Sequence, residues 1–455
     1  MRIVIALCLL PLLAACSVQV QHSEMGLALP ANWTVPGQAA PRNETLSNWW
    51  AAFDDPELAA LIRQSREGSF DIAAAAARVG QARALARMAG AAMLPRVDAD
   101  ISASYGKEET GRASGGAYSA GVSAAYEVDV WGGNAAQRDA ALAALAATQY
   151  GRDAVAITLF AEVGSAYFQT AALRERVKIA RLNLASAERI LELLHVRAAA
   201  GAATPLEVAQ QSALTEAQRQ ALAERRQQAQ DSLTTLAVLL GRPLQNLVIE
   251  RADLAGLSVP AISAGVPSEL IVRRADLAKA ERSLAAADAD VAAARAAMLP
   301  SLTLGAGASA GSEHWRRMLH APLYTLVAGL AAPVFDGGRL SAARDQAYAR
   351  REELLADYRG AIIRALGEVE IALNAVQSAA SQRQIQAKAL HHARVAVELA
   401  ESRYRWGAES MLAVLDVQRT LYAAQDEAVE LALRQLLAGV GLFKALGGGW
   451  AGAAL

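Results

Sequence analysis

Cysteine is almost absent from this chain, which has only 2 Cys among its 455 residues, at positions 8 and 16. Because Cys8 lies in an N-terminal segment that we expect to be removed, a disulfide framework is excluded. Aromatic residues make up only 5% of the chain, whereas hydrophobic residues reach 54%, and alanine supplies much of the excess. Alanine has the highest helix propensity. This composition predicts long, closely packed helices rather than a thick aromatic core.

An excess of charge of one sign is also lacking. The net charge of −1 gives no reason to expect nucleic acid as a partner. After the N-terminus no segment reaches the ~18 uninterrupted apolar residues that indicate a transmembrane helix. The metalloprotease, nucleophile-elbow and Walker motifs are missing, so we expect neither an enzyme nor a bound cofactor or metal. If the chain crosses a membrane, it must do so with strands.

The N-terminus has the pattern of a processing signal. Residues 1–15 contain one early arginine and an apolar stretch too short to span a bilayer. They end in Leu-Ala-Ala before Cys16, which resembles the cleavage site of a bacterial lipoprotein signal. We therefore expect the signal to be removed, the Cys16 thiol to carry lipid, and residues 16–54 to form an extended arm. A plain secretory signal with an incidental cysteine is the alternative.

The remaining chain contains the same pattern twice, about 205 residues apart. Met93–Pro95 recurs as Met298–Pro300, and Trp131–Gly133 corresponds in position to Asp336–Gly338. The two glycine pairs, Gly132 with Gly133 and Gly337 with Gly338, are expected to turn a strand into a long helix. A duplicated unit of two strands and long helices predicts an α+β fold class.

The predicted boundaries follow from this repeat. The first copy covers residues 55–241, with a helix, a hairpin at 96–130, a long helix at 134–197 and a return helix at 204–240. The second copy covers residues 268–446, with a helix, a hairpin at 301–335, a long helix at 340–405 and a return helix at 410–446. Residues 242–267 are expected to link the copies, and residues 447–455 to form a tail.

Both predicted hairpins alternate between apolar and polar residues. The strands are expected at 96–106, 118–130, 301–311 and 323–335, each near the ~9–11 residues that a tilted membrane strand needs. The long helices contain no proline and at ~1.5 Å per residue would each reach ~100 Å. Four strands cannot close a barrel, and an open sheet edge is not tolerated in lipid. The strands must then be shared among several copies of the chain, as an obligate oligomer.

Several motifs resemble the TolC-like outer-membrane efflux factors, and the acylated OprM/NodT branch fits best. They are Trp49-Trp50, Phe53–Leu58, the two Met-Leu-Pro segments, Phe335–Arg339 and Val414–Arg419. The resemblance implies a homotrimer with a twelve-stranded barrel continuous with a periplasmic helical tunnel. It also implies a place in the outer membrane of a Gram-negative bacterium, in contact with its lipid. The implied partners are a periplasmic adaptor and an inner-membrane pump, most often of the resistance-nodulation-division type. One departure is Ala275, where the family commonly has proline.

The resemblance also implies a gate at the periplasmic end. By position it assigns Leu412 to an apolar ring and Asp416 and Arg419 to ionic or hydrogen-bonding contacts. Glu207, at the corresponding turn of the first copy, is a weaker candidate, and the three residues have no clear counterparts around it. An ordinary solvated i,i+3 pair is the alternative interpretation of Asp416 and Arg419.

The function that we expect is therefore that of an exit duct in a tripartite efflux system for small molecules such as drugs or other toxic compounds. Heavy-metal efflux and type I protein secretion stay open, because the substrate is selected by the pump. A lipid-anchored coiled-coil scaffold would explain the helices and Cys16, but it would not explain the alternating hairpins.

Overall fold

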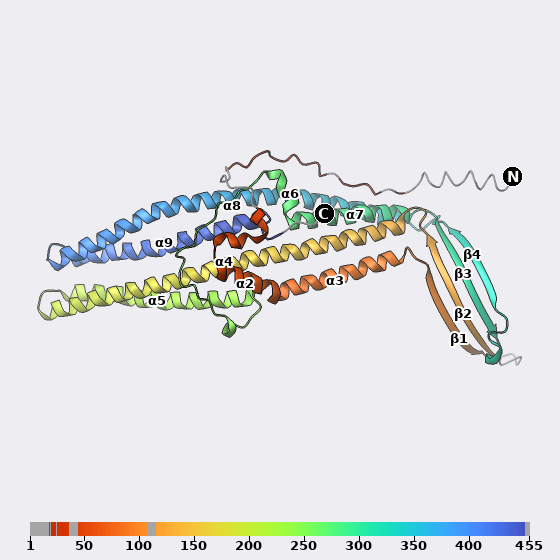
Figure 1. Ribbon diagram of the computed structural model, residues 1–455, viewed down its shortest axis with the longest axis horizontal. Helices are drawn as coiled ribbons and strands as arrows, with labels where there is room; N and C mark the ends of the chain where they lie inside the picture. Colours follow the sequence, from red (N-terminus) through yellow and green to blue (C-terminus); the bar gives the residue numbers. More distant parts are fainter. Residues whose placement is uncertain (1–17, 19, 24, 36–43, 107–114, 451–455) are drawn as a thin grey trace. The chain divides into compact units, whose positions relative to one another are not determined.

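The protein is mostly helical with one small sheet, and its elements occur in the same order twice along the chain (Figure 1). The computed structural model describes residues 18, 20–23, 25–35, 44–106 and 115–450. The first copy comprises α2 (Pro56–Gly68), α3 (Phe70–Ala91), β1 (Arg96–Gly106), β2 (Gly115–Val128), α4 (Gly133–Ala199) and α5 (Pro205–Leu239). The second comprises α6 (Leu270–Arg273), α7 (Ala275–Ala296), β3 (Ser301–Ser312), β4 (Leu323–Ala331), α8 (Arg339–Arg405) and α9 (Met411–Ala445). The predicted α+β fold class is confirmed.

Short 3-10 helices lie outside these repeats or in their loops. They are η1 (Glu44–Phe53), η2 (Leu244–Asn246), η3 (Pro267–Glu269) and η4 (Trp315–Arg317). None of the helices in the described ranges is both long and apolar enough to cross a membrane. Helix α7 begins at Ala275, so the alanine that replaces the family's usual proline still permits a helix start there.

The chain divides into two compact units. The first contains the sheet with the adjoining parts of α3, α4, α7 and α8, within Ala76–Tyr150 and Leu277–Ala361, together with the residues up to Leu27. The second contains Ala28–Ala75, Gly151–Asp276 and Ile362–Leu455. Each unit takes residues from both copies of the sequence repeat. The division into arm, repeats, linker and tail remains a prediction.

The sheet of the first unit is an antiparallel meander in the order β1-β2-β3-β4. Residues directly opposite each other share a face, so the register fixes both faces of the sheet. Val97 lies opposite Ala124, which lies opposite Ala306, which in turn lies opposite Leu326, and these residues belong to an apolar face. The other face carries the acidic residues Asp98 and Asp100 and most of the serine and glycine positions. Strands β1 and β4 are each paired on one side only among the described residues.

Two strands end earlier than predicted. Strand β2 ends at Val128 rather than at residue 130, because the carboxylate of Asp129 instead accepts hydrogen bonds from the backbone N–H groups of Asn134 and Ala135, at 3.0 and 2.8 Å. Strand β4 ends at Ala331 rather than at residue 335. Pro333 lies just beyond that end, and proline has no N–H for the ladder. The apolar residues that follow Pro333 extend the alternating pattern in the sequence but not the strand.

A cluster of aromatic residues forms the core of the second unit. Trp49 stacks on Phe443 with ring centroids 5.7 Å apart, and Phe53 lies 5.2 Å from Phe168. Trp49, Phe168 and Phe443 are fully buried. Beside Phe168, the hydroxyl of Tyr167 donates to Asp55 at 2.9 Å, and Arg251 forms a 2.8 Å ion pair with the same buried carboxylate. This network fixes the start of α2 against the middle of α4.

Candidate functional site at the helix tips

The first helical hairpin turns between α4 and α5. Gly201 has a φ of +70°, a conformation that glycine adopts without strain, and its N–H donates to the Ala198 carbonyl at 3.0 Å. Thr204 then caps α5: its hydroxyl accepts from the N–H of Glu207, and the Glu207 carboxylate accepts from the Thr204 N–H at 2.7 Å. That backbone hydrogen bond lowers the pKa of Glu207. The carboxylate of this weaker gate candidate is therefore engaged in a local capping box.

The second helical hairpin turns between α8 and α9 with related geometry. Gly407 has a φ of +75°, and the Ser410 hydroxyl accepts from the N–H of Ala413 at 3.3 Å. The position that Glu207 occupies in the first tip is taken here by Ala413. The second tip therefore has a serine cap but no capping box.

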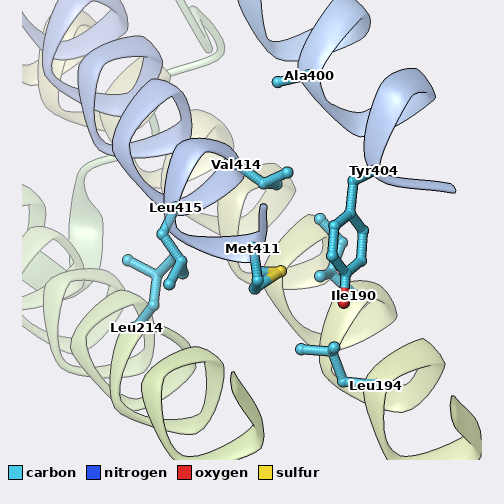
Figure 2. Close-up of a cluster of buried hydrophobic side chains, with 8 residues drawn as sticks. All are labelled: Ile190, Leu194, Leu214, Ala400, Tyr404, Met411, Val414 and Leu415. Atoms are coloured by element: carbon cyan, nitrogen blue, oxygen red, sulfur yellow. The ribbon is translucent and has the colours of Figure 1, made fainter. Parts of the chain in front are cut away.

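A buried apolar cluster joins the two tips. Figure 2 shows its eight side chains pointing toward one another from four helices. The cluster contains Ile190 and Leu194 of α4, Leu214 of α5, Ala400 and Tyr404 of α8, and Met411, Val414 and Leu415 of α9. Leu194 and Met411 are almost completely inaccessible to solvent. Because these side chains come from both hairpins, the cluster resists separation of the two tips.

Tyr404 supplies polar contacts at the edge of this cluster. Its hydroxyl donates to the Glu207 carboxylate at 3.4 Å, and burial followed by the nearby Glu207 charge raises the pKa of Tyr404. The Arg197 guanidinium lies 4.9 Å from the centre of the Tyr404 ring and also donates to the Tyr404 carbonyl. The tips are thus held by apolar burial, two long hydrogen bonds of 3.4 Å and a cation–π contact.

The predicted gate residues lie on a different face of α9. Leu412, Asp416 and Arg419 are all exposed, whereas Met411, Leu415 and other intervening residues are buried in the protomer. At their spacing of four and three residues, the three side chains follow one helix face. Neither Asp416 nor Arg419 has an ion-pair partner among the residues that the structure describes. A solvated pair within the helix is therefore not formed in this protomer.

Alignment of the two tips on their capping residues, Thr204 and Ser410, corrects one expectation. Leu412 does have a counterpart, Leu206. Each is the second residue of its helix, and Leu206 is 65% exposed while Leu412 is 64% exposed. The sequence comparison around Glu207 alone missed this correspondence. The charged positions Asp416 and Arg419 correspond to Gln210 and Ala213. Only the charges are thus specific to the second tip.

The four glycines predicted at the strand-to-helix turns lie where β2 and β4 lead into α4 and α8. Gly132, Gly337 and Gly338 have positive φ values of 76°, 67° and 86°. A Cβ on Gly133 would lie 3.0 Å from the Ala296 side chain. The turn before α8 is capped by Asp336, which accepts from the N–H groups of Gly338 and Leu340 at 3.0 and 2.8 Å. These turns set the direction in which each long helix leaves the sheet.

Comparison with known proteins supplies the family. A sequence profile described as outer membrane efflux protein matches residues 61–242 and 266–448. The chain belongs to this family. It is 47% identical over 458 residues to the pyoverdine export outer membrane protein OpmQ of Pseudomonas putida strain KT2440, covering 98% of this chain and 97% of that protein. The OpmQ protein of Pseudomonas aeruginosa strain PAO1 is 46% identical over 457 residues, covering 98% of this chain and 96% of its own length.

A solved structure agrees with this membership. The outer-membrane channel OprN superposes with a TM-score of 0.87 at 27% identity, over 95% of this chain and 100% of that chain. The protein is therefore an outer-membrane efflux channel of tripartite systems, not an enzyme, and the outer-membrane location predicted from the sequence is confirmed.

The predicted lipid site lies outside the described residues, but the described part of the arm that follows it makes specific contacts. The Val18 N–H donates to the Trp131 carbonyl, and Val18 and Val20 pack against alanines of α4 and α7. The backbone N–H and the hydroxyl of Ser23 both donate to the buried carboxylate of Asp288, at 3.0 and 2.7 Å. The lipidation of Cys16 in this efflux protein remains a prediction. Cys16 lies two residues before Val18, whose backbone N–H donates to the Trp131 carbonyl.

Sequence reasoning missed the residues that join the tips, namely Tyr404, Met411 and Arg197. A partial signal was available, since Tyr404 and Met411 flank the predicted turn between the helices at 340–405 and 410–446. Their partners on α4 are about 200 residues away in the chain, and no local pattern connects them. The assignment of Leu412, Asp416 and Arg419 as gate residues stays a prediction.

Proposed function

We propose that three copies of this chain assemble into the exit duct of a tripartite efflux system. In such a trimer the exposed edges of β1 and β4 pair with those of neighbouring copies and close a twelve-stranded barrel, while the long helices form a periplasmic conduit. The unpaired edges support this arrangement, because strand edges in lipid must be satisfied. A periplasmic adaptor and an inner-membrane pump, of the resistance-nodulation-division type, complete the system.

The substrate that we propose is pyoverdine or an exported small molecule of similar chemistry. The observation that supports this choice is 47% identity with the pyoverdine export protein over nearly the whole of both chains. The test is complementation of a Pseudomonas putida strain that lacks its own OpmQ. Production of this chain is expected to restore pyoverdine in the culture medium, measured by chromatography. A strain that stays deficient in exported pyoverdine but tolerates more heavy metal than the same strain without this chain would support the metal-efflux alternative instead.

We further propose that the tips of α8 and α9 close the periplasmic end of the duct. Leu412 contributes an apolar ring, and Asp416 and Arg419 form contacts between neighbouring copies. Two observations support this: the three side chains share one exposed face, and the two charged groups have no ion pair within the described part of the protomer. Exposed charge pairs contribute only about 0–1 kcal/mol each, so a few of them can hold an end shut reversibly.

Single-channel recording in planar bilayers tests the gate. Replacement of Asp416 and Arg419 by Ala is expected to raise the conductance, because both partners of each contact are removed. The matched control replaces Glu216 and Arg219, a pair with the same spacing on α5 that is already formed within the protomer. That control is expected to leave the conductance unchanged. Unchanged conductance in the Asp416 and Arg419 variant would exclude these residues from the gate.

A further inference from the structure

The apolar face of the sheet has aromatic residues near both of its ends. Tyr118 lies opposite Ala103 on one side and Ser312 on the other, and Tyr324 lies opposite Ala308, so both share the face of Val97 and Leu326. Both tyrosines lie toward the hairpin loops. Tyr126, on the same face, lies toward the strand-to-helix turns, about 26 Å from Tyr118 at about 3.3 Å per residue. This matches an apolar band of ~25 Å with aromatic girdles, as in outer-membrane strands.

The loop between β3 and β4 lies just beyond the girdle at the loop end. Within His314–His320 it carries two arginines and two histidines, and the acidic residue next to it is Glu313. The Trp315 side chain is 66% exposed and Leu319 is 73% exposed. The Arg316 guanidinium lies 5.7 Å from the centre of the Trp315 ring. Among the described residues neither Arg316 nor Arg317 has an ion-pair partner. The loop is therefore basic, aromatic and exposed at one time.

We infer that this loop, which we call the headgroup loop (His314–His320), binds the phosphate groups of the phosphorylated glycolipid in the outer leaflet of the outer membrane. The inference rests on the proposed function for one point, that the sheet spans the membrane with its helices on the periplasmic side. The loop then lies at the level of the outer headgroups. Arginine binds phosphate through two parallel N–H donors. Trp315 and Leu319 suit the boundary between headgroups and acyl chains, where amphipathic rings gather.

Lipid is favoured over a soluble anion because the basic residues adjoin exposed apolar ones. A free phosphate needs donors but no exposed tryptophan or leucine beside them. A lipid offers both: its charged headgroup lies at the level of the loop, and its apolar chains lie at the level of the sheet. Three copies of the headgroup loop would surround each trimer.

The experiment titrates the full-length trimer, purified in mild detergent, with fluorescent lipid A that carries both phosphates. Each arginine near an anionic lipid surface contributes about a fivefold increase in affinity, so R316Q/R317Q is expected to weaken binding by about 25-fold. The matched control is R83Q/R87Q, which removes two exposed arginines from α3, away from the headgroup loop. It is expected to bind as the unmodified protein does. Dephosphorylated lipid A is expected to bind R316Q/R317Q and the unmodified protein with equal, low affinity.

Three results would overturn the inference. They are unchanged binding by R316Q/R317Q, equal binding of phosphorylated and dephosphorylated lipid A, and full displacement of the lipid by millimolar inorganic phosphate, which would indicate a free-anion site. Bilayer conductance separates this inference from the proposed function. Trimers of R316Q/R317Q that still insert and conduct leave the proposed function intact, whatever their lipid affinity, whereas an unmodified protein that forms no conducting trimer contradicts the proposed function itself.

Discussion

Two adjacent residues at the start of α9 are expected to respond to the same substitution in opposite ways. Met411 is 1% exposed and packs in the cluster that joins the two hairpins, so Met411→Ala is expected to cost about 2–5 kcal/mol in stability. Leu412 is 64% exposed in the protomer. Full burial of a leucine contributes about 1.5–3 kcal/mol, so the third of its surface that is covered is worth about 0.5–1 kcal/mol. Leu412→Ala therefore has little stability to lose within the protomer.

The functional effects are expected to differ in the same pair. If Leu412 lines the closed end of the duct, its truncation in three copies widens the constriction and raises the single-channel conductance. The trimer should keep almost the unmodified thermal midpoint, measured by circular dichroism. Met411→Ala should lower this midpoint clearly, because the cavity lies between the hairpins. It should also make the channel current noisier, since the tips are then held less firmly.

The two measurements together can refute the assignment. Suppose that Leu412→Ala lowers the thermal midpoint as far as Met411→Ala does and leaves the conductance unchanged. Leu412 would then be buried against a neighbouring copy rather than facing an opening. In that case the exposed face of α9 is an ordinary subunit contact, and the gate must be sought elsewhere.

Two further predictions concern backbone geometry and the lipid site. Gly447→Ala should sharply reduce the yield and thermal midpoint of the trimer, because a Cβ there would lie 2.0 Å from the Arg273 carbonyl oxygen. A Cβ at Gly407 would meet nothing within 4 Å, so Gly407→Ala should cost only the ~1–2 kcal/mol of a non-glycine residue in the left-handed conformation. Equal losses would contradict this reasoning. Cys16→Ser should abolish palmitate labelling while trimers still insert, and labelling that survives would exclude Cys16.

Much of the fold could be predicted because local chemistry determines it. The turns between each long helix and its return helix and the alternating hairpins each follow from residues within one segment. The end of β4 could not be placed from alternation alone. Val334 and Phe335 continue the apolar pattern past Pro333, yet both are exposed and outside the ladder. A missing backbone donor therefore outweighed the side-chain pattern.

The site was predictable only in part, for a different reason. The sequence gives the positions of Asp416 and Arg419 on one helix face, but their role depends on copies of the chain that no single sequence represents. The contact of Tyr404 with Glu207 brings together residues almost 200 positions apart. Such contacts depend on how the long helices align, and an error of one turn in a helix of 67 residues would move them by about 5.4 Å.

The differences between the two tips indicate where a reversible closure can act. Both tips present an exposed leucine, Leu206 or Leu412, at the second residue of the return helix. In the first tip the Glu207 carboxylate is held by Thr204 and contacts Tyr404, so it is not free to bind another copy. In the second tip Asp416 and Arg419 are exposed and have no ion pair within the described protomer. A trimer would therefore have three charged contact sets rather than six, all of them on α9. Opening would require these weak contacts to break and the apolar cluster between the hairpins to loosen at the same time. A docking partner could achieve this without unfolding either helix.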